Sequence, residues 1–232
     1  MTDPILIQGA MGVELEVLLS QLKTPSEIIR GGFQFWKGTI AENPVVLSRT
    51  GIGMVNAAAA TARGITYFAP SVVLNQGLAG AQTAELHVGD IVLGETAVDI
   101  HSAETSPRGR GEGSEALSWL PGERSEVLHG DLAWLQRLQE TPYRGGIVQA
   151  GRLGAGDVFN READRIAYLT RQRGHLCEDM ESFAAYSVCA GFKLPCVGVR
   201  VISNNELTGE PYQRTIAEKL QEWLLAALGN ET

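Results

Sequence analysis

The chain of 232 residues carries a net charge of −8, and 44% of its residues are hydrophobic while only 6% are aromatic. This charge disfavours nucleic acid and anionic membrane surfaces as partners, because both would repel the chain. No stretch approaches the ~20 apolar residues of a membrane span, and no basic region precedes the short apolar run at the N-terminus. We therefore expect neither a membrane span nor a signal peptide.

Runs of β-branched and apolar residues alternate along the chain with segments of helical periodicity. The expected strands are Ile5–Gln8, Phe33–Ile40, Val45–Arg49, Val72–Asn75, Asp90–Glu95, Gly146–Gln149 and Cys196–Ile202. The expected helices are Val13–Leu22, Val55–Tyr67, Asp131–Glu140, Arg161–Gln172, Glu181–Ala190 and Gln213–Leu228. This alternation predicts one α/β domain over residues 1–232, with a mostly parallel sheet and helices on both faces. The second and third strands look like a hairpin, which would make the sheet mixed.

The first strand leads through Gly9 and Ala10 into a helix that carries Glu14 in its first turn. An acid there can simply complement the helix dipole, which is worth ~0.3–1 kcal/mol. It can also overhang the ligand crevice that lies beyond the carboxyl ends of the strands. This segment by itself favours the dipole role over that of a general base.

Two glycine-containing stretches follow strands. "RTGIGMVNAAAA" (49–60) has Asn56 where a dinucleotide fingerprint needs a third glycine, so a nicotinamide cofactor is not expected. "VVLNQGLAGAQ" (72–82) reads as a strand entering a glycine turn. Leu78 stands in the middle of it instead of a hydroxyl that could donate to an anion, so the stretch does not resemble a phosphate cradle.

The segment His101–Glu123 is rich in glycine, serine, proline and charge. Loops of this length without secondary structure are usually disordered or functional. Because Trp119 and Leu120 would need burial, we expect a loop that covers substrate or contacts a second subunit.

"CEDMESFAAY" (177–186) places three acids around Met180 where a strand meets a helix. Asp179 could cap the helix. Glu181 is expected to be partly buried and could accept hydrogen bonds from both hydroxyls of a ribose. Capping and sugar binding both remain open on the residues alone.

"VRVISNNEL" (199–207) begins as a buried strand and is expected to run out into polar space at Ser203, Asn204 and Asn205. No His and Asp accompany Ser203 in the order of a hydrolase triad. His101 and His175 lack metal-ligand spacing, so no metal is expected. The three cysteines have no C-x-x-C spacing, which disfavours disulfides and favours the cytoplasm.

Together, these stretches resemble the purine nucleosidase and phosphorylase superfamily, most closely its methylthioadenosine/S-adenosylhomocysteine nucleosidase branch. The matching motifs stand in the family's order and cover nearly the whole chain: "GAMGVE" (9–14), "SRTGIGMVNAA" (48–58), "NQGLAG" (75–80), "VGDIV" (88–92), "AGDVF" (155–159), "EDMES" (178–182) and "VRVISN" (199–204). Each motif is weak alone, but seven in register are specific for the superfamily.

The resemblance implies a three-layer α/β/α sandwich with a central twisted mixed sheet, assembled as a homodimer. It implies cleavage of the N-glycosidic bond of a purine nucleoside without a cofactor, through an oxocarbenium-like cation as in glycoside hydrolysis. Such chemistry needs a base to orient water, a group to hold the ribose hydroxyls and a partner for purine N7.

The resemblance also assigns roles to residues. Glu14 matches the water-activating glutamate, so the role of general base replaces the dipole role that its segment alone favours. Glu181 matches the ribose-diol glutamate, and Asp179 replaces another motif acid. The remaining substrate-binding positions are Met180 beneath the sugar, Phe159 near the base, the backbone of Asn160 at the purine edge, Ala79 and Arg200.

Two positions depart from the nucleosidase pattern. An aspartate that protonates or hydrogen-bonds N7 is replaced by Asn204, which can donate a hydrogen bond but cannot transfer a proton. A serine is replaced by Leu78, which disfavours phosphate as the nucleophile and leaves water.

Four hypotheses follow. The leading one is a purine nucleoside hydrolase similar to the methylthioadenosine/S-adenosylhomocysteine nucleosidases, with Glu14 and Asn204 as its catalytic residues. The second is a 6-oxopurine nucleosidase of the inosine or futalosine type, because the Asn204 amide can donate to O6. The others are a phosphorolytic enzyme and a nucleoside-binding protein that has lost catalysis.

Overall fold

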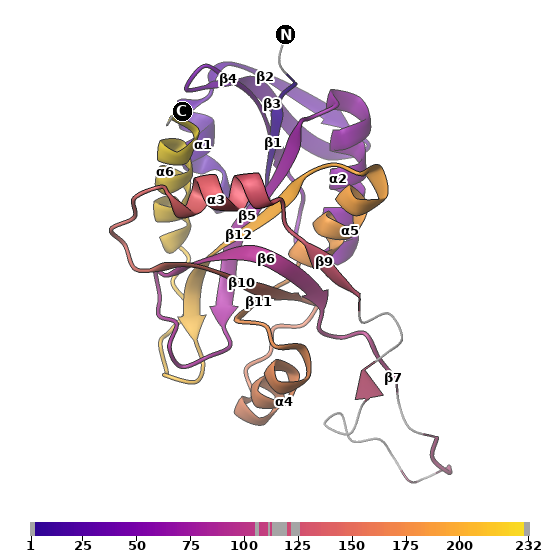
Figure 1. The fold of residues 1–232 in the computed structure, drawn as a ribbon. Helices are drawn as coiled ribbons and strands as arrows, with labels where there is room; N and C mark the ends of the chain where they lie inside the picture. Colours follow the sequence, from indigo (N-terminus) through magenta and orange to yellow (C-terminus); the bar gives the residue numbers. More distant parts are fainter. Residues whose placement is uncertain (1–2, 105–106, 111, 113–119, 122–125, 230–232) are drawn as a thin grey trace.

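The computed structural model describes residues 3–104, 107–110, 112, 120–121 and 126–229. Most of its strands belong to one sheet (Figure 1). Along the chain the strands are β1 Ile5–Gly9, β2 Lys23–Arg30, β3 Phe33–Ile40, β4 Asn43–Arg49, β5 Val72–Ala81, β6 Ile91–Asp99, β7 Ala103–Glu104, β8 Leu120–Pro121, β9 Val127–His129, β10 Val148–Ala155, β11 Cys177–Asp179 and β12 Cys196–Asn205.

The sheet is mixed, and part of it closes on itself. Its order is β11-β10-β6-β12-β5-β1-β4-β3-β2, with β9 paired to β6. Strand β1 pairs in parallel with β4 and β5, whereas β3 pairs antiparallel with β4 as the expected hairpin. Because β11 also pairs with β5, the strands β5, β12, β6, β10 and β11 form a closed ring. The predicted mixed α/β sheet is confirmed, and the ring adds a closure that the sequence did not predict.

Helices cover both faces of the sheet. They are the 3₁₀ helix η1 Gly12–Glu14 and the α-helices α1 Glu16–Gln21, α2 Met54–Phe68, α3 Leu132–Gln139, α4 Ala163–Arg173, α5 Ser182–Phe192 and α6 Ile216–Gly229. Residues of α1, α3 and α6 join one hydrophobic cluster, and residues of α2 and α5 join the other. Figure 1 shows α1 and α6 on one side of the sheet and α2 and α5 on the other.

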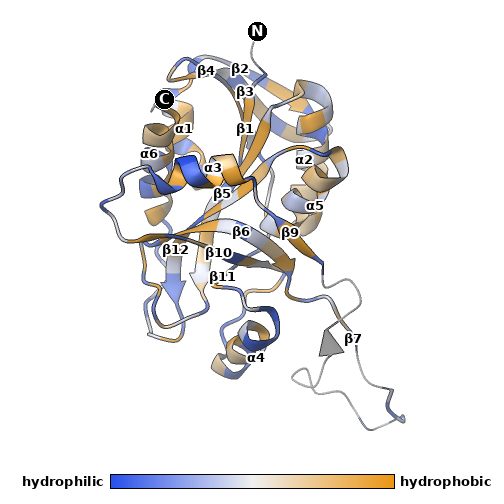
Figure 2. Ribbon diagram, viewed as in Figure 1, coloured by the Kyte–Doolittle hydropathy of each residue, from blue (hydrophilic) through white to orange (hydrophobic). Residues whose placement is uncertain are grey.

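The two clusters follow from side-chain alternation along the strands. Ile5 and Ile7 of β1 lie in the cluster with α6, while Leu6 between them lies in the cluster with α5. Successive side chains of a strand point to opposite faces of a sheet, so continuous apolar runs indicate strands that are covered on both sides. Figure 2 shows the resulting concentration of hydrophobic residues on the central strands.

Several predicted boundaries were wrong, for identifiable reasons. The helix expected over Val13–Leu22 is broken at Leu15, with η1 before it and α1 after it. Strand β5 continues through its glycines to Ala81 instead of turning, because β12 pairs with it along this whole length. Strand β12 likewise continues to Asn205. Strand β2 was missed because its residues are nearly all exposed and show no apolar alternation.

The expected loop His101–Glu123 includes the short antiparallel pair β7 and β8. Trp119, on which the expected covering role depended, lies outside the described residues. That role therefore stays a prediction.

Candidate active site

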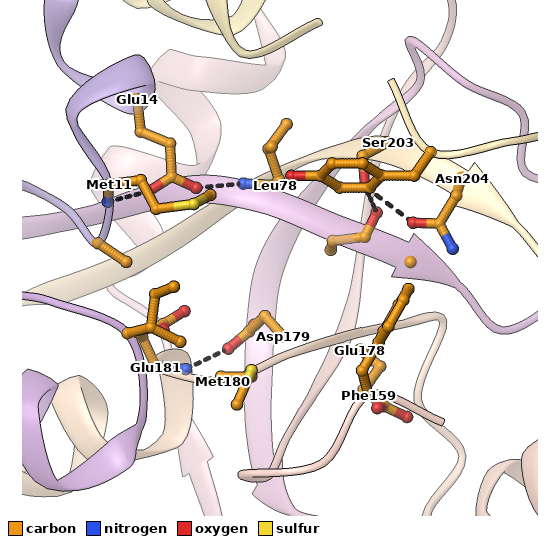
Figure 3. Close-up of a pocket in the computed structure, with 15 residues that line it drawn as sticks. Met11, Glu14, Leu78, Phe159, Glu178, Asp179, Met180, Glu181, Ser203 and Asn204 are labelled. Atoms are coloured by element: carbon orange, nitrogen blue, oxygen red, sulfur yellow. Dashed lines mark hydrogen bonds between the residues drawn. The ribbon is translucent and has the colours of Figure 1, made fainter. Parts of the chain in front are cut away.

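A cavity of about 300 Å³ lies at the carboxyl-terminal parts of β1, β5, β11 and β12 (Figure 3). This volume is within the range of small-molecule sites, ~300–1,000 Å³. Its lining residues come from segments far apart in the sequence: Ala10, Met11, Glu14, Ile52, Leu78, Ala79, Gly80, Phe159, Glu178, Asp179, Met180, Glu181, Ser203, Asn204 and Tyr212. Six of the eight expected site residues are among them. Asn160 and Arg200 are not, and both are buried behind the wall.

Glu14 is held in the cavity wall by backbone donors. One carboxylate oxygen accepts from the N–H of Met11 at 2.9 Å, and the other accepts from the N–H of Leu78 at 2.9 Å. The residue is only 3% exposed. Burial raises the pKa of Glu14, and the hydrogen bonds from Leu78 and Met11 oppose that rise. The carboxylate is thus fixed in place, and its raised pKa makes it a better proton acceptor than an exposed glutamate.

Gly77 makes this position of Glu14 sterically feasible. A Cβ at residue 77 would lie 2.6 Å from Oε1 of Glu14. That separation is far inside van der Waals contact, so any side chain here would displace the carboxylate. The glycines of β5 therefore serve the approach of a side chain to the strand, and not a chain reversal.

Glu181 lies across the cavity from Glu14 (Figure 3). Its Oε1 accepts from the backbone N–H of Gly53 at 2.8 Å. Gly53 has φ +100°, a conformation that favours glycine. Burial, together with the charges of Asp179 and Glu14, raises the pKa of Glu181 to about 7.

Asp179 supports Glu181 from a neighbouring position in the cavity wall. Its Oδ1 accepts from the N–H groups of Glu181 and Ser182 at 2.8 and 2.7 Å, which anchors the start of α5. Its Oδ2 lies 3.0 Å from Nε of Arg200. Arg200, 1% exposed, also donates to the carbonyl and side chain of Asn75. The arginine is therefore a buried counter-ion of Asp179, and its nitrogens face protein groups.

A bulge in β12 presents two consecutive side chains to the cavity. The pairing of β12 with β5 shifts register between Ile202 and Asn204. In a regular strand Ser203 and Asn204 would point to opposite faces, whereas both line the cavity here. The Ser203 hydroxyl lies 2.9 Å from Oδ1 of Asn204 and can donate to it. This contact orients the amide so that its NH₂ group lies away from Ser203. One N–H of that group donates to Glu206 at 3.4 Å, and the other is left for a ligand.

Glu178 is a lining residue to which the sequence assigned no role. Its carboxylate accepts from the backbone N–H of Asn160 at 3.1 Å and from the Asn160 side-chain amide at 2.9 and 2.8 Å. Both residues are buried, at 6% and 7% exposure. Burial, opposed by the Asn160 hydrogen bonds, raises the pKa of Glu178 to about 7. The backbone N–H of Asn160, expected at the purine edge, is thus already bound to Glu178.

The cavity is acidic. Four carboxyl groups line it, from Glu14, Glu178, Asp179 and Glu181, and its described lining includes no Lys, Arg or His. Such a wall repels a phosphate group and favours neutral, hydroxyl-bearing ligands. The three cysteines are buried and free, and none of them lines the cavity. Within the described ranges there is no cluster of three metal-ligating side chains, and no helix that could span a membrane.

The rim of the cavity is apolar and exposed. Ile52, Phe159 and Tyr212 line the cavity yet are 53%, 53% and 50% exposed. Ile52 and Tyr212 were not expected in the site. Ile52 stands in one of the seven motifs and Tyr212 in none, and nothing in the sequence marked either side chain as part of a catalytic set.

The chain matches known proteins over almost its entire length. Residues 4–228 match the family model of the phosphorylase superfamily. A 5′-methylthioadenosine/S-adenosylhomocysteine nucleosidase of Glaesserella parasuis serovar 5 (strain SH0165) is 30% identical over 230 residues, which are 97% of each chain. A nucleosidase of the same name from Colwellia psychrerythraea 34H, solved in complex with adenine, has a TM-score of 0.82 at 25% identity, covering 99% of this chain and 96% of that one.

A futalosine hydrolase of Helicobacter pylori strain 26695 has the same fold, with a TM-score of 0.82 at 22% identity over 98% of this chain and 97% of that one. The family expected from the seven sequence motifs is confirmed. This chain belongs to the phosphorylase superfamily.

Proposed function

We propose that the chain hydrolyses the N-glycosidic bond of a purine nucleoside and releases the free purine and a ribose derivative. One observation carries this proposal: Glu14 and Glu181 face the same cavity from opposite sides, each fixed by backbone N–H groups. A nucleoside between them would present its anomeric carbon to one carboxylate and its hydroxyls to the other. The relationship to a 5′-methylthioadenosine/S-adenosylhomocysteine nucleosidase supports this chemistry.

In the proposed reaction Glu14 orients a water molecule toward C1′ and accepts its proton as the new C–O bond forms. The C1′–N9 bond breaks and its electron pair leaves with the purine. Glu181 accepts hydrogen bonds from the two ribose hydroxyls, with Met180 beneath the sugar. The carboxylates stabilise the positive charge that develops on the ribose ring, as in other glycoside hydrolyses.

Asn204 is proposed to bind the purine through its NH₂ group, since its oxygen is engaged by Ser203. It donates a hydrogen bond to N7 but supplies no proton, so the departing purine takes its proton from solvent. Phe159 is proposed to stack near the base, with Ala79 beside it. Arg200 is proposed to act through Asp179 and Glu181, because it does not line the cavity.

Water is the proposed nucleophile. The cavity is lined by four carboxyl groups and, in the described chain, by no basic side chain. Leu78 presents a backbone N–H that is already bound to Glu14 and no hydroxyl. A phosphate ion would therefore enter against repulsion and find few donors.

We further propose a cytoplasmic homodimer in which the whole chain acts as one domain. The exposed apolar side chains at the cavity rim, Ile52, Phe159 and Tyr212, would be covered by a second copy. Three free cysteines are consistent with a reducing compartment. Light scattering after size-exclusion chromatography tests the dimer, and a monomer at micromolar concentration would contradict it.

The proposed reaction is tested by chromatography of a substrate panel incubated with and without phosphate. The panel contains methylthioadenosine, S-adenosylhomocysteine, inosine and futalosine. We expect free purine at a rate that phosphate does not change. Release that requires phosphate would identify a phosphorylase. Nucleosides that raise the melting temperature but stay intact would identify a binding protein without catalysis.

A further inference from the structure

The far end of the cavity from Glu14 and Glu181 holds a second set of polar groups. Figure 3 shows Glu178, Phe159 and Asn204 together at this end. Glu178 stands between the cavity and Asn160, which is buried behind it and donates to both carboxylate oxygens. We propose that Glu178, positioned by Asn160, accepts a hydrogen bond from N1–H of a purine, and that 6-oxopurine nucleosides are therefore the preferred substrates. This inference rests on the proposed function.

Hydrogen-bond donors are scarce at this end of the cavity. Adenine N1 is an acceptor and needs a donor. The backbone N–H and the side-chain NH₂ of Asn160 both donate to Glu178 and are not available to a ligand. The Ser203 hydroxyl is engaged by Asn204 and the Ala79 carbonyl. Tyr212 interacts electrostatically with Glu14, toward the sugar end. An adenine ring would thus bring the N1 lone pair against a carboxylate without a donor to bind it.

The order of donors and acceptors along one edge of the base also distinguishes the two purines. A 6-oxopurine presents N7 and O6 as neighbouring acceptors, followed by N1–H as a donor. One N–H of the Asn204 NH₂ group lies 3.4 Å from a carboxylate oxygen of Glu206. The other N–H can bind the acceptor edge formed by N7 and O6, and the carboxylate of Glu178 can bind the donor. Adenine presents N6–H₂ where O6 would be, so it offers a donor to the NH₂ group of Asn204. Both protein groups therefore complement the 6-oxopurine and conflict with adenine.

The burial of Glu178 also favours a ligand that donates a hydrogen bond to its carboxylate. Glu178 is 6% exposed, and burying an ionised carboxylate is costly unless its oxygens are bonded. Asn160 binds both oxygens, and because Glu178 lines the cavity its carboxylate can accept a further hydrogen bond from a ligand. A ligand N–H would supply that bond. The competing arrangement, in which Glu178 accepts from N6–H₂ of adenine, predicts the opposite order of substrates.

The test compares pairs of nucleosides that share a sugar and differ only at the purine edge. These are methylthioinosine with methylthioadenosine, and inosine with adenosine. At pH 8 we expect kcat/KM for the 6-oxopurine member to exceed that of its partner at least tenfold. Glu178→Gln should reduce this ratio at least tenfold. The control Glu162→Gln makes the same chemical change on the exposed surface before α4 and should leave the ratio unchanged. A preference for the 6-aminopurines, or a ratio that Glu178→Gln does not alter, would overturn the inference.

Two further measurements separate this inference from the proposed function. Calorimetric binding of free hypoxanthine and adenine needs no hydrolysis, and hypoxanthine should bind at least tenfold more tightly. Tighter adenine binding would refute the role of Glu178 even in an active hydrolase, whereas tighter hypoxanthine binding would support it even if no nucleoside were cleaved. On the unmodified protein, 1-methylinosine lacks N1–H and should have a kcat/KM at least tenfold below that of inosine. Equal values would count against the proposed contact.

Discussion

The two ends of the cavity hold their polar groups in different ways. At the sugar end, backbone N–H groups of Met11, Leu78 and Gly53 bind the carboxylates of Glu14 and Glu181. At the base end, the side chain of Asn160 and the hydroxyl of Ser203 orient Glu178 and Asn204.

Because of this difference, the geometry of the sugar end is set by the backbone fold, whereas the geometry of the base end is set by individual side chains. Backbone donors stay in place whichever side chains the chain carries, so the groups that act on the ribose depend on the strands themselves. The groups at the base end depend on side-chain pairs that one substitution can change. We therefore expect substitutions at the sugar end to affect every nucleoside alike, and substitutions at the base end to change the choice of purine.

The largest effect is expected from Glu14→Gln. The amide keeps the shape of the side chain but cannot accept a proton from water, and loss of a positioned base typically costs ~10²–10⁴ in rate. Steady-state kinetics should show this loss in kcat for 6-oxopurine and 6-aminopurine nucleosides alike. A loss of less than tenfold would remove Glu14 from its role as the base.

Gly77→Ala should come next, with a fall in kcat of roughly 10²-fold, the cost of a ~1 Å misplacement of a catalytic group. The added methyl would lie 2.6 Å from the Glu14 carboxylate and force it to move. Gly191→Ala is the matched control, because a Cβ there meets nothing within 4 Å. If Gly77→Ala keeps full activity and a normal melting temperature, the position of Glu14 is not critical.

Asn204→Asp should change selectivity more than rate. A carboxylate at residue 204 accepts from N6–H₂ of adenine and loses the NH₂ group that faces O6, and a pair of base contacts is worth ~1–3 kcal/mol of discrimination. Competition between methylthioadenosine and methylthioinosine should show the ratio moving at least tenfold toward adenine. No movement would mean that residue 204 does not contact the purine edge.

The smallest predicted effect is a dependence of purine preference on pH. Burial raises the pKa of Glu178 to about 7, so its carboxylate is ionised above that pH and protonated below it. Only the ionised form accepts from N1–H, so kcat/KM for 6-oxopurine nucleosides should fall with the ionised fraction of Glu178. The preference for 6-oxopurines should therefore fall, by up to about tenfold, as pH is lowered from 8 to 6.

Other charges act on Glu178, namely Asp179 beside it and Arg165 of α4. The pKa of Glu181 across the cavity is also raised to about 7. Because Glu14 and Glu181 act on the sugar that both substrates share, a ratio of kcat/KM values cancels their titration. The ratio for Glu178→Gln should not vary with pH, and a persistent variation would assign the effect to another group.

Sequence patterns predicted the parts of this molecule that local physics determines. The apolar runs around Ile5 and Val72 indicated strands covered on both faces, and the Phe33–Ile40 hairpin followed from its turn and alternation. Strand β2 was not predicted, because an edge strand needs no apolar face and its sequence therefore shows no apolar alternation. The bulge that turns Ser203 and Asn204 to the same side depends on pairing with β5, which no pattern within residues 199–207 reports.

The site shows the same division. Glu14, Glu181 and Asn204 were found because they stand in motifs with known order. Glu178 stands in one of those motifs, yet its role depends on Asn160, which lies 18 residues away and meets it only through the fold. The position of the Glu178 carboxylate in the cavity therefore depends on its contact with Asn160, and the residues next to Glu178 in the sequence do not reveal it.

The division of the cavity into a sugar end and a base end is tested most directly by a crystal structure of Glu14→Gln with intact inosine. We predict the sugar between residues 14 and 181, with both ribose hydroxyls within 3.2 Å of the Glu181 carboxylate, a limit typical of hydrogen bonds at about 2.7–3.2 Å. We also predict N1 at hydrogen-bond distance from Glu178 and O6 facing the amide of Asn204. A nucleoside bound with its sugar at the Asn204 end, or outside this cavity, would contradict this division.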